Sequence, residues 1–134
     1  MPNNWSETSM ATNYTPQRAQ YQRSAVLTAS QGQLIVMLYD GANRFLAQAG
    51  VAMSERQVEA AHNKLRRAEM IISHLQASLD FERGGEIAPR LAAIYTFCQR
   101  HLNQARINAD PEAIEQVRAL LGTLRDAWSQ IAAT

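Results

Sequence analysis

The 134-residue sequence contains a single cysteine, Cys98, and no apolar run that approaches the roughly 18 residues of a membrane-spanning helix. A lone cysteine excludes an internal disulfide and a metal site built from several cysteines. The chain also lacks the start of a secretory signal peptide, in which a charged segment and an apolar stretch precede a small-residue cleavage site. These absences predict a cytoplasmic protein that does not insert into a membrane.

The chain also lacks a large excess of one charge, because it contains 13 Lys and Arg residues and 12 Asp and Glu residues, for a formal net charge of +1. Binding to nucleic acid needs clustered cations that face phosphates, so nucleic acid is not an expected partner. The one dense basic group is Lys64, Arg66 and Arg67, and its helix-forming neighbours indicate a solvated helix face. The length favours one domain with a substantial core.

Motifs for catalysis, cofactors or metals are scarce. "RGGE", residues 83–86, lacks the lysine and the preceding strand of a phosphate-binding loop. Glu59 and His62 have the Glu-x-x-His spacing of di-iron bundle proteins, but the second copy that such a site needs is missing. Cys98 falls on an apolar helical stripe, which favours a buried small hydrophobe over a reactive thiol. We therefore expect no enzyme activity, no cofactor and no metal.

What the sequence does contain is helical periodicity, with no strand pattern. Four segments repeat their apolar residues with the 3.6-residue period; they are about Gln31–Ala52, about Gln57–Leu79, a third that begins near Glu86 and a fourth that opens with Pro111. Ser30 and Asp110 are suitable N-caps, and Gly84 and Gly85 supply a tight turn. Short connections make neighbouring helices antiparallel, so the expected fold is all-α, an up-and-down four-helix bundle.

The N-terminal part of the chain differs from the rest. Residues 1–13 are polar and aperiodic, which predicts a disordered tail. Residues 14–29 contain only scattered apolar residues, which predicts a cap segment that can dock on the bundle or leave it. The bundle itself is expected to occupy residues 30–134 as a single domain.

The first helix is apolar almost all the way round, with six apolar residues in a row from Leu34 to Tyr39. Leu34, Leu38 and Phe45 are predicted to build the core. The helices also carry apolar residues away from their main stripes: Val36, Met37, Tyr39, Met70, Ile71, Tyr95, Phe97 and Leu120. A helix that contacts two neighbours needs a broad apolar face, which can account for Met37, Ile71 and Leu120. The three aromatic residues of this set are harder to bury and favour a binding surface.

Four motifs in series resemble the FliS family, the cytoplasmic export chaperones of flagellin: "TASQGQLIVMLYDGANRFL", "NKLRRAEMIISHLQASLD", "GGEIAPRLAAIYTF" and "IEQVRALLGTLRDAWSQI". The resemblance extends from about Tyr21 to Ile131, and "MLYDGA" followed by "GGEIA" is the most specific pair. Family members often have a proline after the serine of "TAS", where this chain has Gln31. That departure weakens the signal for the helix start without affecting the expected fold.

The resemblance implies an antiparallel helical bundle with an N-terminal cap segment. It implies one-to-one binding to the disordered C-terminal segment of flagellin, which prevents premature polymerisation, and delivery to a membrane protein of the flagellar type III export gate. Some family members also bind an anti-sigma factor. The alternative interpretation is an export chaperone or adaptor with a different client.

The candidate partner-binding residues come from two sources. Tyr21 and Val26 fall on a tyrosine and a valine of the family, and Tyr14 stands near an apolar residue of the cap segment that contributes to export-gate docking in some members. The surplus apolar residues supply the others. The complete set is Tyr14, Tyr21, Val26, Met37, Tyr39, Tyr95, Phe97 and Leu120.

Overall fold

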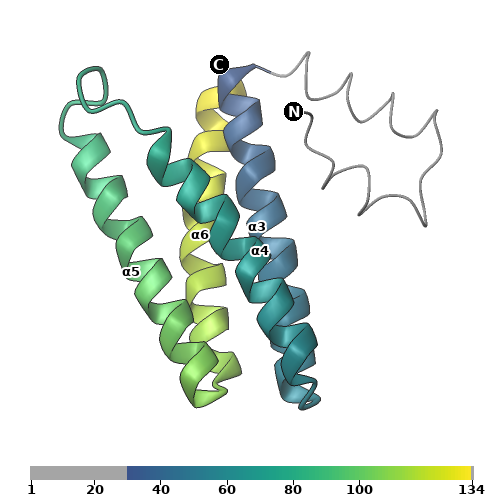
Figure 1. Ribbon diagram of the computed structural model, residues 1–134. Coiled ribbons are helices and arrows are strands. Elements are labelled where there is room, and N and C mark those ends of the chain that lie inside the picture. The colour runs from purple at the N-terminus through teal and green to yellow at the C-terminus, as the bar shows by residue number, and fades with distance from the viewer. Residues whose placement is uncertain (1–29, 134) are drawn as a thin grey trace, which may run out of the picture. The chain divides into compact units, whose positions relative to one another are not determined.

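The computed structural model describes residues 30–133, which form four α-helices. They are α3 (Gln31–Ser54), α4 (Val58–Ala77), α5 (Ile87–Asn108) and α6 (Pro111–Ala133). Successive helices run in opposite directions and pack as a bundle (Figure 1), which confirms the predicted all-α architecture. The predicted tail (1–13) and cap segment (14–29), with Tyr14, Tyr21 and Val26, lie outside the described residues.

The helix ends form as their sequences predict. Asp110 precedes α6, and its carboxylate accepts a hydrogen bond of 3.0 Å from the backbone N–H of Glu112, so it caps the helix. Pro111 then occupies the first helical position, where its missing N–H costs nothing. The preceding helix α5 stops at Ala109, whose φ of 50° takes the chain into the left-handed region.

The loop between α4 and α5 depends on Asp80 and two glycines. The Asp80 carboxylate accepts hydrogen bonds of 3.0 Å from the backbone N–H groups of Glu82 and Arg83. Gly84 comes so close to the Asp80 carbonyl that an added Cβ would lie 2.6 Å from that oxygen, and Gly85 has a φ of +53°. The turn thus uses both glycines, as the sequence predicted. Gly84 leaves no room for a side chain, and the left-handed backbone at residue 85 favours glycine.

A single core of buried side chains runs through the bundle. In α5 the predicted apolar stripe is buried at Leu91, Cys98, Leu102 and Ala105, but Ile94 is only partly buried and Ile87 is exposed. In α3 the core is centred on Ala42, Leu46 and Ala49, which are fully buried, and on Tyr39.

The prediction that Leu34, Leu38 and Phe45 build this core is therefore wrong in its emphasis. All three are only partly buried, and Leu38 and Phe45 pack against the core from its edge. The reason is that α3 packs extensively against both α4 and α6. Its buried arc is consequently broad, and the neighbouring stripe that contains Ala42 and Leu46 faces the middle of the bundle.

The bundle has two unlike halves. We call residues 41–69 and 98–121 the closed half, which holds the α3–α4 and α5–α6 turns. Residues 30–40, 70–97 and 122–133 are the open half, which holds the α4–α5 loop. Helix α6 buries Ala113, Ile114, Val117 and Leu121 in the closed half, but none of its side chains from residue 122 to 132 is buried.

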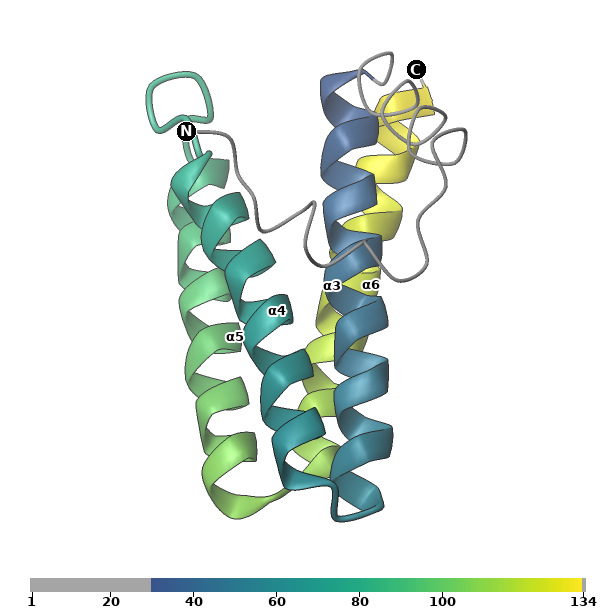
Figure 2. The same ribbon diagram turned by 45° about the vertical axis from the view of Figure 1, so that its right-hand side comes forward.

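The difference follows from how the helices pair. Helix α5 packs less closely on its neighbours than α3 does on α4 and α6. In the open half α3 remains packed on α6. Gly32 lies so close to Ala132 that a Cβ added to the glycine would be 3.1 Å from the Ala132 Cβ. Figure 2 shows the α3–α6 pair and the α4–α5 pair diverging toward the α4–α5 loop. The four apolar stripes therefore meet fully at one end of the bundle only.

Candidate functional site

Two tyrosines meet inside the bundle where the open half begins. Tyr39 of α3 and Tyr95 of α5 are 0% and 2% exposed, and their hydroxyl oxygens lie 2.5 Å apart in a buried hydrogen bond. The bond joins α3 to α5, which lie diagonally across the bundle because each of them packs mainly on α4 and α6. One hydroxyl donates and the other accepts, so each buried oxygen has a hydrogen-bond partner and both rings can be buried.

The expectation that Tyr39 and Tyr95 resist burial is therefore wrong. Sequence reasoning treated each hydroxyl separately, whereas the structure pairs them across the core. Burial raises the pKa of Tyr39 and of Tyr95 above the ordinary tyrosine value. Cys98 is fully buried, which confirms the predicted buried side chain, and this burial raises the pKa of its thiol to about 11.

Above this tyrosine pair the open half contains an apolar pocket of about 280 Å³, which we call the open-end pocket. Its apolar lining comes from all four helices: Ile35, Leu75, Leu79, Ile87, Ala88, Leu91, Tyr95 and Trp128. Asp80, Arg83 and Gly84 of the α4–α5 loop form part of its rim. Tyr95 thus forms part of the pocket wall although almost none of its surface is exposed.

Sequence reasoning missed this pocket although it placed several of its residues correctly. Leu75, Ile87 and Trp128 each fall on an apolar helical stripe, so each reads as a core residue. Whether opposing stripes meet depends on the angle between the helix pairs, and no local pattern specifies that angle. The structure leaves Ile87 63% exposed and Trp128 only partly buried.

A second apolar surface follows the seam between α5 and α6. Phe97 is 50% exposed and stacks on the His101 ring, with 5.0 Å between ring centroids. His101 Nε2 lies 2.5 Å from Oε1 of Gln116 on α6. Phe97 lies one turn before His101 on α5, and Leu120 lies one turn after Gln116 on α6. Because the two helices are antiparallel, Phe97 and Leu120 lie at the same level of the seam.

The remaining candidates occupy different positions. Leu120 is partly buried and packs against the core, while Met37 is 41% exposed on α3. Met37 lies on the side of α3 that faces α4, because Gly41, one turn later, closely approaches Ile71 of α4. The structure therefore does not gather the predicted residues of the described part of the chain into one patch. It distributes them over the core, the α5–α6 seam and the α3–α4 seam.

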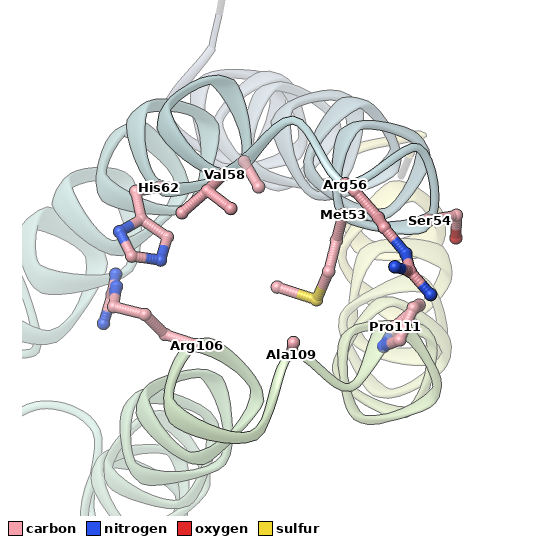
Figure 3. A pocket seen from close by; sticks show the side chains of 9 residues that line it. Met53, Ser54, Arg56, Val58, His62, Arg106, Ala109 and Pro111 are labelled. Atoms are coloured by element: carbon pink, nitrogen blue, oxygen red, sulfur yellow. The ribbon is translucent and has the colours of Figure 1, made fainter.

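The closed half has a pocket of its own, of about 550 Å³, beside the two turns. Figure 3 shows Met53 reaching into its middle, with His62 and Arg106 on one side and Arg56, Ser54 and Pro111 on the other. Arg106 is held by hydrogen bonds to Asn103 and Glu69. Ser54 and His62 lie on opposite sides and no carboxylate lines the pocket, so the arrangement does not form an activated nucleophile.

No group of three or more His, Cys, Asp or Glu side chains in residues 30–133 is placed to hold a metal ion. Within the same range no helix is both long and apolar enough to cross a membrane.

Comparison with known proteins gives a consistent result. The model of a protein family described as "Flagellar protein FliS" matches residues 13–134. The flagellar secretion chaperone FliS of Salmonella typhimurium (strain LT2) is 45% identical to this chain over 109 residues, which are 81% of each protein.

More distant relatives carry the same description. The flagellar secretion chaperone FliS of Escherichia coli (strain K12) is 38% identical over 108 residues, which are 80% of this chain and 79% of that protein. The one from Bacillus subtilis (strain 168) is 34% identical over 110 residues, 82% of this chain and 81% of that protein. In each case the match extends over most of both proteins.

Proposed function

The chain belongs to the FliS family of flagellar secretion chaperones, and from this premise we propose that it binds the disordered C-terminal segment of flagellin in the cytoplasm. The bound segment is kept from polymerising and is presented to the export gate of the flagellar type III apparatus. The observation that carries this proposal is the open-end pocket, an apolar cavity to which all four helices contribute and that no described side chain fills.

A disordered client needs apolar anchoring points, because its binding must offset the entropy lost when it becomes ordered. The open-end pocket of about 280 Å³ is near the lower end of the volumes of ligand pockets, so it has room for apolar side chains of the client. The half-exposed ring of Phe97 and the adjacent Leu120 extend the apolar surface along the α5–α6 seam. A client segment that enters the pocket and continues along this seam would bury both surfaces.

The two buried tyrosines have a different part in this proposal. Tyr39 and Tyr95 do not offer side-chain surface for a client to cover, apart from the portion of Tyr95 that forms the pocket wall. Their hydrogen bond fixes the distance between α3 and α5 directly beneath the pocket. They are proposed to set the shape of the site, while Phe97 and Leu120 contact the client.

Calorimetric titration with the C-terminal segment of the same organism's flagellin tests the proposal. We expect saturable one-to-one binding with a negative heat-capacity change, the signature of apolar surface burial. Ile87→Gln should weaken binding at least about tenfold, because it places a polar amide at the pocket. Ile87 is 63% exposed, so the substitution should leave the bundle folded.

A matched control is available on the same helix. Ile107 is 72% exposed and lies at the other end of α5, outside the open-end pocket. Ile107→Gln should leave the affinity within about twofold of the unmodified protein. Equal weakening by both substitutions would contradict the placement of the client at the open half.

Absence of binding by the unmodified protein would reject flagellin as the client and favour an export chaperone with a different one. The proposed export-gate and anti-sigma-factor partners require separate titrations with those proteins. The roles of Tyr14, Tyr21 and Val26 stay predictions. A chain that starts at Gln22 tests Tyr14 and Tyr21 together in the same titration.

A further inference from the structure

The seam between α3 and α4 carries cations without acidic partners. Arg44 of α3 and Lys64 and Arg67 of α4 belong to none of the ion pairs found in residues 30–133. Their exposure alone would suggest an ordinary solvated face. Their arrangement around apolar side chains gives them a more specific character.

Two cations of the seam lie over the same aromatic ring. The Lys64 ammonium lies 5.6 Å from the centroid of the Phe45 ring, and the Arg67 guanidinium lies 5.7 Å from it. These distances fall within the range of cation–π contacts, which hold both charges near the α3 surface. A Cβ added to Gly41 would lie 3.9 Å from a terminal nitrogen of Arg44, so that guanidinium folds back along the same seam.

The nearest acidic residues of these two helices are engaged elsewhere. Asp40 accepts a hydrogen bond of 2.9 Å from Arg125 of α6, and Glu69 is paired with Arg106 of α5. The remainder of α3 contains no other acid, and α4 has none between Glu59 and Glu69. The positive charge of the seam is therefore not neutralised from within the described bundle.

An apolar strip continues from these cations into the open half. Met37, Gly41 and Arg44 recur at spacings of four and three, so they lie on one stripe of α3. Ile71 of α4 faces this stripe, because its Cδ1 lies within van der Waals distance, 3.4 Å, of the position that a Cβ on Gly41 would occupy. Met37 is 41% exposed. The seam thus offers apolar side chains beside a group of three cations.

We propose that the α3–α4 seam docks an acidic amphipathic helix of a partner protein, with apolar side chains against Met37 and Ile71 and carboxylates toward Arg44, Lys64 and Arg67. Charge complementarity identifies this occupant, because unpaired cations favour an acidic ligand and the apolar strip favours an amphipathic one. The chain's own first 29 residues do not fit, since they contain two arginines and one glutamate.

The test uses a synthetic amphipathic helical peptide of about 18 residues, or five turns, with a leucine stripe flanked by glutamates. Fluorescence anisotropy of the peptide, labelled with a neutral dye, measures its binding to the full chain. An otherwise identical peptide with glutamine in place of glutamate serves as the uncharged probe. The full chain should bind the acidic peptide at least about tenfold more tightly, and salt should reduce the difference.

Two sets of substitutions locate the site. The triple variant Arg44→Gln, Lys64→Gln and Arg67→Gln should weaken the acidic peptide at least about tenfold. The control triple variant Arg56→Gln, Arg90→Gln and Arg100→Gln removes the same charge from exposed arginines elsewhere and should change the affinity by less than about twofold. Met37→Gln should weaken both peptides alike, because it removes only apolar contact.

Thermal unfolding of each variant establishes that the bundle is intact. Equal effects of the two triple variants would overturn the proposal, because net charge rather than the seam would then govern binding. The proposal would also be overturned if the full chain failed to bind the acidic peptide but bound anionic phospholipid vesicles or duplex DNA through the seam. This proposal does not depend on the identity of the client at the open half.

Discussion

The two halves of the bundle are built from the same four helices and the same apolar periodicity, yet they pack differently. In the closed half every helix contributes fully buried side chains, including Leu46, Leu65, Leu102 and Val117. In the open half α6 contributes none among its described residues. Each half has a pocket: the one of about 280 Å³ in the open half is lined mainly by apolar side chains, whereas the one of about 550 Å³ in the closed half lies beside the turns and includes Arg56, His62 and Arg106 in its lining. The two ends of one small fold thus differ in how completely the helices pack and in which side chains line their pockets.

This division accommodates two requirements that conflict in a uniform bundle. A core packed to full density gives a stable fold but leaves no apolar cavity for a client. A bundle that is open along its whole length would lose much of the burial that stabilises it. The hydrogen bond between Tyr39 and Tyr95 lies beneath the open-end pocket and separates the dense region from the open one.

The largest effect is expected from a Leu→Ala substitution in α5, and the loss in the free energy of unfolding should depend on which half holds the leucine. Leu102→Ala in the closed half should lower the free energy of unfolding by about 3–5 kcal/mol, because the cavity it leaves is enclosed. Leu91→Ala at the open-end pocket should cost about 2 kcal/mol, since Leu91 is already 8% exposed and the new space opens to the pocket. Urea denaturation of both variants measures the difference, and equal losses would contradict the contrast between the halves.

Alkaline pH should weaken the fold through the buried thiol at the boundary of the halves. Cys98 has a pKa of about 11 in the folded protein against 9.0 as its ordinary value. The unfolded chain therefore loses this proton first, and stability falls as the pH rises from 9 toward 11. The expected loss is about 2–3 kcal/mol.

Urea denaturation at a series of pH values, with Cys98→Ala as the comparison, isolates the contribution of the thiol. The alanine variant should show a shallower decline, and the remaining slope reports the two tyrosines, whose pKa values are also raised by burial. A decline as steep as that of the unmodified protein would mean that water from the open half already reaches the thiol.

The tyrosine pair should give the next smaller effect. Tyr39→Phe leaves the Tyr95 hydroxyl buried without its partner, which should cost about 1–3 kcal/mol. Tyr39→Phe combined with Tyr95→Phe should cost less than the sum of the two single substitutions, because it removes both polar atoms together. Strict additivity in thermal denaturation would show that the hydroxyls do not act as a pair.

The smallest effect is expected at the ion pair between α3 and α6. Asp40 and Arg125 are joined at 2.9 Å, but their side chains are 46% and 37% exposed. Water screens such a pair, so Asp40→Asn should lower stability by less than about 1 kcal/mol, and high salt should abolish the difference. A larger loss that persists in high salt would show that this pair, rather than apolar packing, holds α3 against α6.

Most of the fold could be predicted from the sequence, because local chemistry determines it. Helical periodicity, the Asp110 cap and the two glycines of the α4–α5 loop specify four antiparallel helices and their turns. The four motifs also identified the family, which the comparisons confirm.

The site was harder to predict, because it depends on distances between helices. The pairing of Tyr39 with Tyr95 joins positions 56 residues apart, and neither residue's neighbours indicate it. The open-end pocket arises from the angle between helix pairs, so its residues resemble core residues in the sequence. The basic group of Lys64, Arg66 and Arg67 was visible, but its relation to Phe45 and Arg44 on the other helix was not.

Hydrogen exchange of the backbone amides, measured with and without the C-terminal segment of flagellin, tests the central claim most directly. The account predicts that the free protein exchanges faster in the open half, and that the client protects the end of α4, the start of α5 and the end of α6. The closed half should change little. Protection confined to the closed half, or uniform protection of the whole bundle, would contradict the assignment of the client to the open end.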